Sequence, residues 1–147
     1  HLNAVEKIIA LKQRDASKGM ILIADSLQRF AEYIKPLPDN ISDKIRKHPG
    51  ITWLVPAKEN VSPLITGDFT TVAIRICKNA DIAQLSQLLN SPLISTSANI
   101  SHLPVARNKN EIKKMFPEGV DFVIEGDVPE DAKPSKNRDA FTDEIFR

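Results

Sequence analysis

The sequence of 147 residues is long enough for one domain with a substantial hydrophobic core. Its 41% hydrophobic and 27% charged residues exclude an intrinsically disordered chain. The net charge of +1 argues neither for nor against a nucleic-acid partner, so any basic character must be local. The single cysteine, Cys77, excludes an internal disulfide, and no apolar run is long enough to span a membrane, so we expect a cytoplasmic protein.

The first third of the chain predicts a helix, a buried strand and a second, shorter helix. Asn3 can cap a helix that continues to about Gln13, because apolar residues recur along it at helical spacing. Residues 20–24 form an apolar run that is typical of a buried strand. A short helix over residues 26–34 follows, and Pro36 ends it.

Three basic residues, Lys12, Arg14 and Lys18, lie between the first helix and the buried strand. Cations at the end of a helix complement its dipole, so a solvated helix cap would explain them without any function. They also lead directly into a core strand, which holds them more firmly than charges on a free surface. We therefore keep them as candidate ligands for an anion.

The middle of the chain predicts a helix over residues 41–47 and two strands. A polar loop over 58–68 separates the strand at 51–55 from a strand at 69–76 that is rich in β-branched residues. Arg75 interrupts this second strand. An arginine in an apolar strand must pair with an anion or reach the rim of the sheet, so an anion site and a rim ion pair both stay open.

A cluster of hydroxyl groups follows the next helix and strand. An amphipathic helix over 81–90 leads into Leu93-Ile94, which predicts a short buried strand. The segment 95–101 then carries four hydroxyl groups and the amide of Asn99. Such uncharged donors at a strand end suit phosphate or carboxylate oxygens if cations come from elsewhere in the chain. A turn that satisfies only its own backbone is the alternative.

The last third predicts a short helix over 111–116 and a strand over 121–125. A polar loop containing Pro134-Ser135 follows, and residues 141–147 form a strand-like end. Strands that alternate with helices predict an α/β or α+β sheet domain.

Most catalytic motifs have no counterpart in this sequence. It has only 5 glycines and no glycine-rich phosphate loop, no zinc-binding C-x-x-C or H-E-x-x-H, and no G-x-S-x-G elbow. What remains is a set of cations and a hydroxyl–amide loop, which together would bind a polyanion such as a nucleotide. Any catalysis would therefore rest on positioning and charge neutralisation in phosphoryl or nucleotidyl transfer.

Four short motifs occur in the order and at roughly the spacing of the YrdC-like family. They are the K-x-R of Lys12-Gln13-Arg14, the strand Thr71–Arg75, the S-x-N within Ser95–Asn99, and Pro134-Ser135. Each motif alone is weak, whereas the ordered set is specific and covers nearly the whole chain. The chain resembles in particular the bacterial TsaC-type threonylcarbamoyl-AMP synthases.

The resemblance implies a fold and a reaction. The implied fold is a single YrdC-like domain over residues 1–147, of α+β (α/β-like) class, with a twisted mixed β-sheet flanked by helices and a concave basic pocket. Enzymes of this kind combine L-threonine, bicarbonate and ATP into L-threonylcarbamoyladenylate (threonylcarbamoyl-AMP) and release diphosphate. The product serves N6-threonylcarbamoyladenosine (t6A) modification at position 37 of tRNA. Mg²⁺ is implied with the ATP, and other proteins of the t6A pathway are implied as partners.

The resemblance also assigns roles to residues, and it assigns none to a metal. The implied catalytic residues are Lys12, Arg14, Ser97 and Asn99. The implied ATP ligands are Lys12, Arg14, Lys18, Thr71, Ser97, Asn99 and Arg147. The implied threonine ligands are Arg75, Ser95 and Ser135.

The chain departs from the family pattern in three places, one of which is the family's usual second proline, missing after Pro49-Gly50. The family opens with a strand and a P-T-E-T-x-Y-G-L-like segment that helps to form the pocket, and residues 1–147 contain no match to it. We expect this segment either to lie outside these residues or to be lost together with its half of the pocket. Lys136-Asn137 stands where the family usually has Thr or Glu and then Ile.

Two other functions fit parts of the same pattern. A YrdC-like module could bind double-stranded RNA or tRNA through a basic concavity, without synthase activity. The presence of both K-x-R and S-x-N, with a net charge of only +1, favours the enzyme. A carbamoyl-transfer domain like that of hydrogenase-maturation proteins is the third function, but such domains lie within much longer chains.

Overall fold

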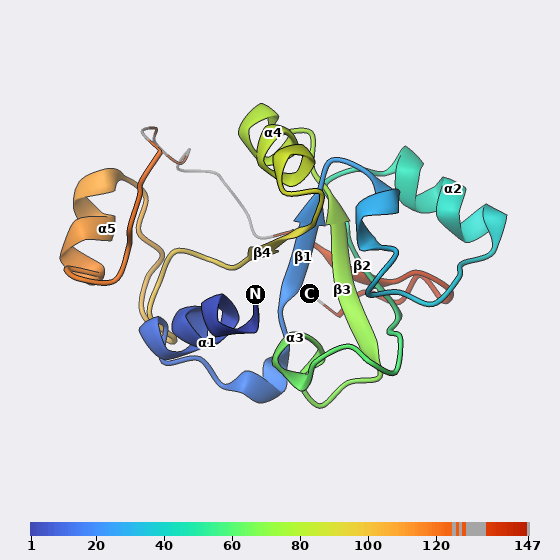
Figure 1. Ribbon diagram of the computed structural model, residues 1–147, viewed down its shortest axis with the longest axis horizontal. Coiled ribbons are helices and arrows are strands. Elements are labelled where there is room, and N and C mark those ends of the chain that lie inside the picture. The colour runs from blue at the N-terminus through green and yellow to red at the C-terminus, as the bar shows by residue number, and fades with distance from the viewer. Residues whose placement is uncertain (125, 127, 129–134, 147) are drawn as a thin grey trace. The chain divides into compact units, whose positions relative to one another are not determined.

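Five strands form one mixed sheet in the order β4-β1-β3-β2-β5 (Figure 1). The computed structural model describes residues 1–124, 126, 128 and 135–146. In chain order, with η marking 3₁₀ helices, the elements are α1 (Leu2–Leu11), η1 (Ala16–Lys18), β1 (Ile21–Ala24), η2 (Leu27–Phe30), α2 (Asp39–Lys47), β2 (Thr52–Pro56), α3 (Pro63–Thr66), β3 (Thr71–Ile76), α4 (Ala80–Leu88), β4 (Leu93–Ser95), α5 (Lys109–Met115) and β5 (Asn137–Asp139). β1 is parallel to β3 and β2 to β5, whereas β1–β4 and β2–β3 are antiparallel. The mixed sheet with helices confirms the predicted fold class, and none of the helices in the described residues is long and apolar enough to cross a membrane.

The chain divides into two compact units. The first consists of His1–Ala16 and Thr96–Pro134 and contains α1 and α5. The second consists of Ser17–Ser95 and Ser135–Arg147 and contains the whole sheet with the remaining helices. A single domain over residues 1–147 stays a prediction.

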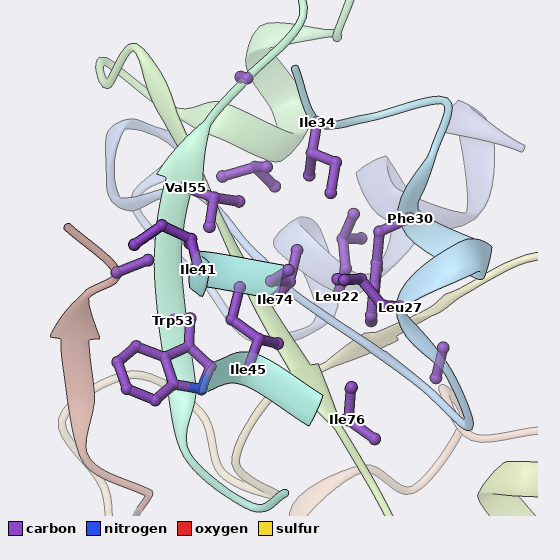
Figure 2. Close-up of a cluster of buried hydrophobic side chains, with 14 of the residues drawn as sticks. Leu22, Leu27, Phe30, Ile34, Ile41, Ile45, Trp53, Val55, Ile74 and Ile76 are labelled. Atoms are coloured by element: carbon purple, nitrogen blue, oxygen red, sulfur yellow. The ribbon is translucent and has the colours of Figure 1, made fainter. Parts of the chain in front are cut away.

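The hydrophobic core lies on one face of the sheet. Alternate residues of a strand point to opposite faces, and β3 accordingly alternates between half-buried and buried positions. η2 and α2 contribute apolar side chains to the same cluster, as Figure 2 shows. On α2, Ile41 and Ile45 are one helical turn apart and buried, while Arg46 and Lys47 are exposed. The core side chains labelled in Figure 2 are Leu22, Leu27, Phe30, Ile34, Ile41, Ile45, Trp53, Val55, Ile74 and Ile76.

Side-chain caps begin several helices. The side chain of Asn79 accepts a hydrogen bond from the Ile82 N–H at 3.0 Å and so caps α4. Asn108 caps α5 in the same way through the Glu111 N–H, at 3.0 Å. The prediction that Asn3 caps the first helix was wrong, because α1 already begins at Leu2 without a side-chain cap.

The sheet ends differently from the sequence prediction. Residues 121–124 of the predicted strand lie outside the sheet, and Phe122 is 80% exposed, because a β-prone run forms a strand only where another strand can pair with it. Residue 125 lies outside the described residues. The last strand is β5, which precedes the predicted strand-like end 141–147 and pairs with β2.

A turn explains why the chain leaves the sheet after β5. The Asp139 carboxylate accepts hydrogen bonds from the N–H groups of Phe141, at 2.8 Å, and Thr142, at 2.9 Å. Beyond this turn, Ile145 forms only an isolated bridge with Arg138. The predicted loop 58–68 contains a further element that the sequence pattern missed, the short helix α3.

Asp25 connects the end of β1 to α4. Its Oδ1 accepts hydrogen bonds from Arg29 Nε and Ser86 Oγ, both at 3.1 Å, and its Oδ2 accepts one from Gln87 Nε2 at 3.0 Å. Burial raises the pKa of Asp25, but the hydrogen bonds from Gln87, Arg29 and Ser86 outweigh it and hold this pKa below its usual value.

The lowered pKa of Asp25 predicts a pH-dependent contribution to stability. The contribution is present above the unfolded-state pKa of about 3.9 and is lost as the pH falls through the folded-state pKa. We expect Asp25→Asn to lower the urea midpoint at neutral pH and the gap from the unaltered protein to shrink below about pH 4. Glu32→Gln, at an exposed position nearby, should leave the midpoint unchanged. A gap that persists undiminished in acid would contradict this assignment.

Candidate functional site

The face of the sheet opposite the core carries several polar side chains. On β3, the half-buried Thr71, Ala73 and Arg75 alternate with the core residues and point away from the core. β4 carries Ser95 at the edge of the same sheet. These residues all belong to the second unit.

Arg75 and Ser95 are in direct contact. The Arg75 Nη2 donates a hydrogen bond to Ser95 Oγ at 3.1 Å. β1 lies between their two strands, with Ile23 paired to Arg75 and Ile21 paired to Ser95. The structure thus brings together two of the three residues predicted to bind threonine.

Ser135, the third residue predicted to bind threonine, is connected to Arg75 and Ser95 through Thr52. The Ser135 and Thr52 hydroxyl oxygens are 3.0 Å apart, and either can donate. The pairing of Trp53 with Ile74 in the antiparallel β2–β3 ladder places Thr52 opposite Arg75. Directly opposite residues have Cβ atoms about 5 Å apart, so Arg75 and the hydroxyl pair are neighbours on one face.

Sequence reasoning missed Thr52 and Asn137. Thr52 is fully buried. A polar residue within an otherwise apolar strand is uncommon, and this feature of the sequence could have identified Thr52 as a candidate. Asn137 lies beside Thr52 in the parallel β2–β5 pair, and its Oδ1 is buried without a hydrogen-bond partner among the residues that the structure describes. No sequence signal marked Asn137, because the strand was predicted further along the chain.

Thr71 lies at the opposite end of β3 from Arg75. Four residues of strand separate the two side chains by about 13 Å along the sheet. The structure therefore does not bring Thr71 into contact with Arg75, and the two could touch only different parts of an extended ligand.

In the first unit, Lys12 is bound to the hydroxyl–amide loop. Its ammonium donates hydrogen bonds to the main-chain oxygens of Ser97 and Asn99 and to Asn99 Oδ1, the last at 3.3 Å. An ammonium group has three hydrogens, so this loop can take all of them. Lys12 is only 5% exposed, and its burial together with the charge of Arg14 lowers its pKa.

Further hydrogen bonds fix the shape of the same loop. Ser97 Oγ donates to Asn99 Oδ1 at 2.7 Å, and Asn99 Nδ2 donates to the Leu103 main-chain oxygen at 2.8 Å. The Ser101 N–H donates to the Lys12 main-chain oxygen at 2.8 Å. The K-x-R lysine and the S-x-N loop therefore form one hydrogen-bonded cluster.

The other predicted basic residues have different surroundings. Arg14 is half-buried just after α1, and Lys18 is exposed at the end of η1. The segment around Lys18 is fixed in place, because Gly67 has φ +64° and a Cβ there would lie 2.1 Å from the Ser17 main-chain oxygen. Arg147 lies outside the described residues.

Comparisons with known proteins match nearly the whole chain. A family model of Sua5, YciO and YrdC proteins, described as telomere recombination, matches residues 1–144. The chain belongs to the Sua5/YciO/YrdC family. Two relatives named threonylcarbamoyl-AMP synthase are similar to it: one from Photobacterium profundum is 38% identical over 98% of this chain and 80% of its own length, and one from Pasteurella multocida is 37% identical over 99% and 81%.

A solved Sua5/YciO/YrdC structure has the same fold. The crystal structure of P. abyssi Sua5 complexed with L-threonine is 27% identical, with a TM-score of 0.82 over 93% of this chain. This chain spans 41% of the length of that Sua5 chain. Among the residues that the structure describes, no group of three His, Cys, Asp or Glu side chains could hold a metal ion.

Proposed function

We propose that this chain is an L-threonylcarbamoyladenylate synthase, a nucleotidyltransferase that makes threonylcarbamoyl-AMP for t6A modification of tRNA. The observation that carries the proposal is the Arg75–Ser95 contact beside the Thr52–Ser135 hydroxyl pair on one sheet face. Relatives of the same name, and the threonine complex of P. abyssi Sua5, support it. Both units would then act as one YrdC-like domain over residues 1–147, in the cytoplasm, where ATP and tRNA are found.

In this proposal the sheet face binds L-threonine. The Arg75 guanidinium would hold the threonine carboxylate, because its planar donors match two carboxylate oxygens at once. Ser95 orients Arg75 through its hydrogen bond. Asn137 Oδ1, which has no partner in the described part of the chain, offers an acceptor for an N–H or O–H of the same substrate.

The cations and the S-x-N loop would bind ATP. Arg14 and Lys18 would neutralise phosphate charge, and Lys12 would hold the loop that presents Ser97 and Asn99 to the nucleotide. Thr71 and Arg147 complete the proposed ATP set. Mg²⁺ would arrive with the ATP as part of the substrate, and we propose no protein ligand for it.

The proposed chemistry has two steps. The threonine amine attacks bicarbonate, which loses water and leaves a carbamate. A carbamate oxygen then attacks the α-phosphorus of ATP, a new O–P bond forms, and the bond to the β-phosphate breaks to release diphosphate. No side-chain nucleophile is required, so the work of the protein is to position the reactants and neutralise charge.

The test is diphosphate release from ATP in the presence of L-threonine and bicarbonate. It should use residues 1–147 and the same residues preceded by a family opening strand. We expect release that depends on threonine and bicarbonate, and a higher rate with the added strand if that strand completes the pocket. No release from either folded protein, together with salt-sensitive binding of tRNA, would favour the RNA-binding module instead.

A further inference from the structure

A cavity lies on the core side of the sheet. It has a volume of about 270 Å³ and is formed by η2, the segment after it, α2 and the residue Lys58. Leu27 and Ile34, which line it, point into the core cluster in Figure 2. Arg75 faces away from that cluster, and none of the residues that line this cavity is among those proposed to bind threonine or ATP.

The walls of the cavity are mostly apolar. Leu27, Ile34 and Leu37 line it, and the first two are buried in the core. Ligand pockets are usually apolar with a few well-placed polar groups, and they span about 300–1,000 Å³. This cavity therefore suits a ligand somewhat smaller than a drug molecule.

Two polar side chains that line the cavity lack partners. Ser42 is only 9% exposed, and its hydroxyl has no hydrogen bond within the described part of the chain. The half-buried Lys58 likewise forms no ion pair or side-chain hydrogen bond with any described residue. Both groups keep contact with solvent, so a bound anion can accept a hydrogen bond from each of them.

The remaining charges of the lining are already paired. Lys35 contacts Glu59 at 3.5 Å, and Arg46 contacts Asp43 at 3.2 Å. No carboxylate is among the described residues that line the cavity, so the ammonium of a zwitterionic amino acid would find no partner in this lining. The lining thus has one uncompensated positive charge, one free hydroxyl and apolar walls.

We propose that this cavity binds a small organic carboxylate with an apolar body. The carboxylate would pair with Lys58 and accept a hydrogen bond from Ser42, and the apolar part would contact Leu27, Ile34 and Leu37. This site is independent of the proposed synthase activity, and neither result depends on the other.

The charge requirement can be tested on the unaltered protein with three probes that share a benzyl group. Phenylacetate, phenylacetamide and L-phenylalanine would be titrated while amide shifts are followed by two-dimensional NMR. We expect phenylacetate to bind saturably with a Kd of roughly 1 mM, shifting the amides of residues 27–37, Ser42 and Lys58. The neutral amide and the zwitterion should bind at least about tenfold more weakly. Equal binding of phenylacetamide, or no saturable shift with phenylacetate, would overturn the proposal.

A pair of variants tests the named cation. Lys58→Gln should weaken phenylacetate binding about tenfold or more, the value expected for one charge-assisted hydrogen bond. Lys47→Gln removes the same charge from an exposed position on α2 that does not line the cavity, and it should leave binding unchanged. Equal affinity of the Lys58→Gln variant and the unaltered protein would also overturn the proposal.

Discussion

Replacing Arg75 by alanine is expected to lower kcat/KM for L-threonine by about a hundredfold. A hydrogen bond to a charged group contributes roughly 1.5–3 kcal/mol, and the guanidinium can offer two of them to one carboxylate. Because Thr71 lies about 13 Å away along β3, contacts to the nucleotide should be less affected, and the KM for ATP should change little. The measurement is the rate of threonine-dependent diphosphate release at varied threonine and at varied ATP.

Two further variants test whether the lower kcat/KM of Arg75→Ala comes from weaker threonine binding and not from misfolding or from the loss of any one positive charge. Ser95→Ala keeps the guanidinium and removes only its 3.1 Å partner, so it should lower kcat/KM by a few-fold. Lys47→Ala removes an exposed cation from α2 and should have no effect. An Arg75→Ala protein with a native circular dichroism spectrum and unchanged kcat/KM for threonine would refute the assignment of Arg75.

The sheet-face site could be predicted in part because strand periodicity is local. Arg75 stood out as a charge in an apolar strand, and the alternation of β3 then determines which face it occupies. The partners of Arg75 depend on strand order and register, which no local pattern gives. Thr52 and Asn137 become neighbours of Arg75 only because β2 pairs with β3 and β5 pairs with β2.

The elements that sequence reasoning misplaced depend on tertiary pairing. Residues 121–124 have strand-like composition but lie outside the sheet, whereas the polar Asn137–Asp139 segment forms β5. A three-residue strand has no periodicity to detect, and its formation depends on β2. Leu93-Ile94 was correctly predicted as a strand, but β4 is at the sheet edge and only half-buried.

The connection between Lys12 and the S-x-N loop could not come from local patterns either. Lys12 is 85 residues from Ser97 and 87 residues from Asn99 in the sequence, and only the family resemblance grouped these residues in one site. The sequence suggested that Lys12 binds phosphate directly. In the structure its ammonium donates to three oxygens of the loop, so we propose a positioning role for Lys12 within the ATP site, and direct binding of phosphate stays a prediction.

Replacing Lys12 by methionine is expected to lower kcat/KM for ATP by about a hundredfold. Methionine keeps much of the aliphatic length of lysine. It leaves the main-chain oxygens of Ser97 and Asn99, and Asn99 Oδ1, without the donor that Lys12 provides. Each lost hydrogen bond from a charged donor costs roughly 1.5–3 kcal/mol. The loop that presents Ser97 and Asn99 should then lose its fixed shape. Diphosphate release at varied ATP measures the first effect, and NMR amide shifts of residues 96–101 measure the second without any substrate.

The amide shifts distinguish a positioning residue from a simple phosphate ligand. If Lys12 served only to bind phosphate, Lys12→Met would change the ATP kinetics and leave the loop amides of the free protein unaltered. Lys7→Met, at an exposed position of α1, should change neither quantity. Lys12→Arg keeps the charge but cannot place donors at all three oxygens in the same geometry, so we expect it to restore only part of the activity. Unaltered loop shifts in Lys12→Met would rule out the positioning role even if activity were lost, because the hydrogen bonds that define that role would then have no effect on the loop.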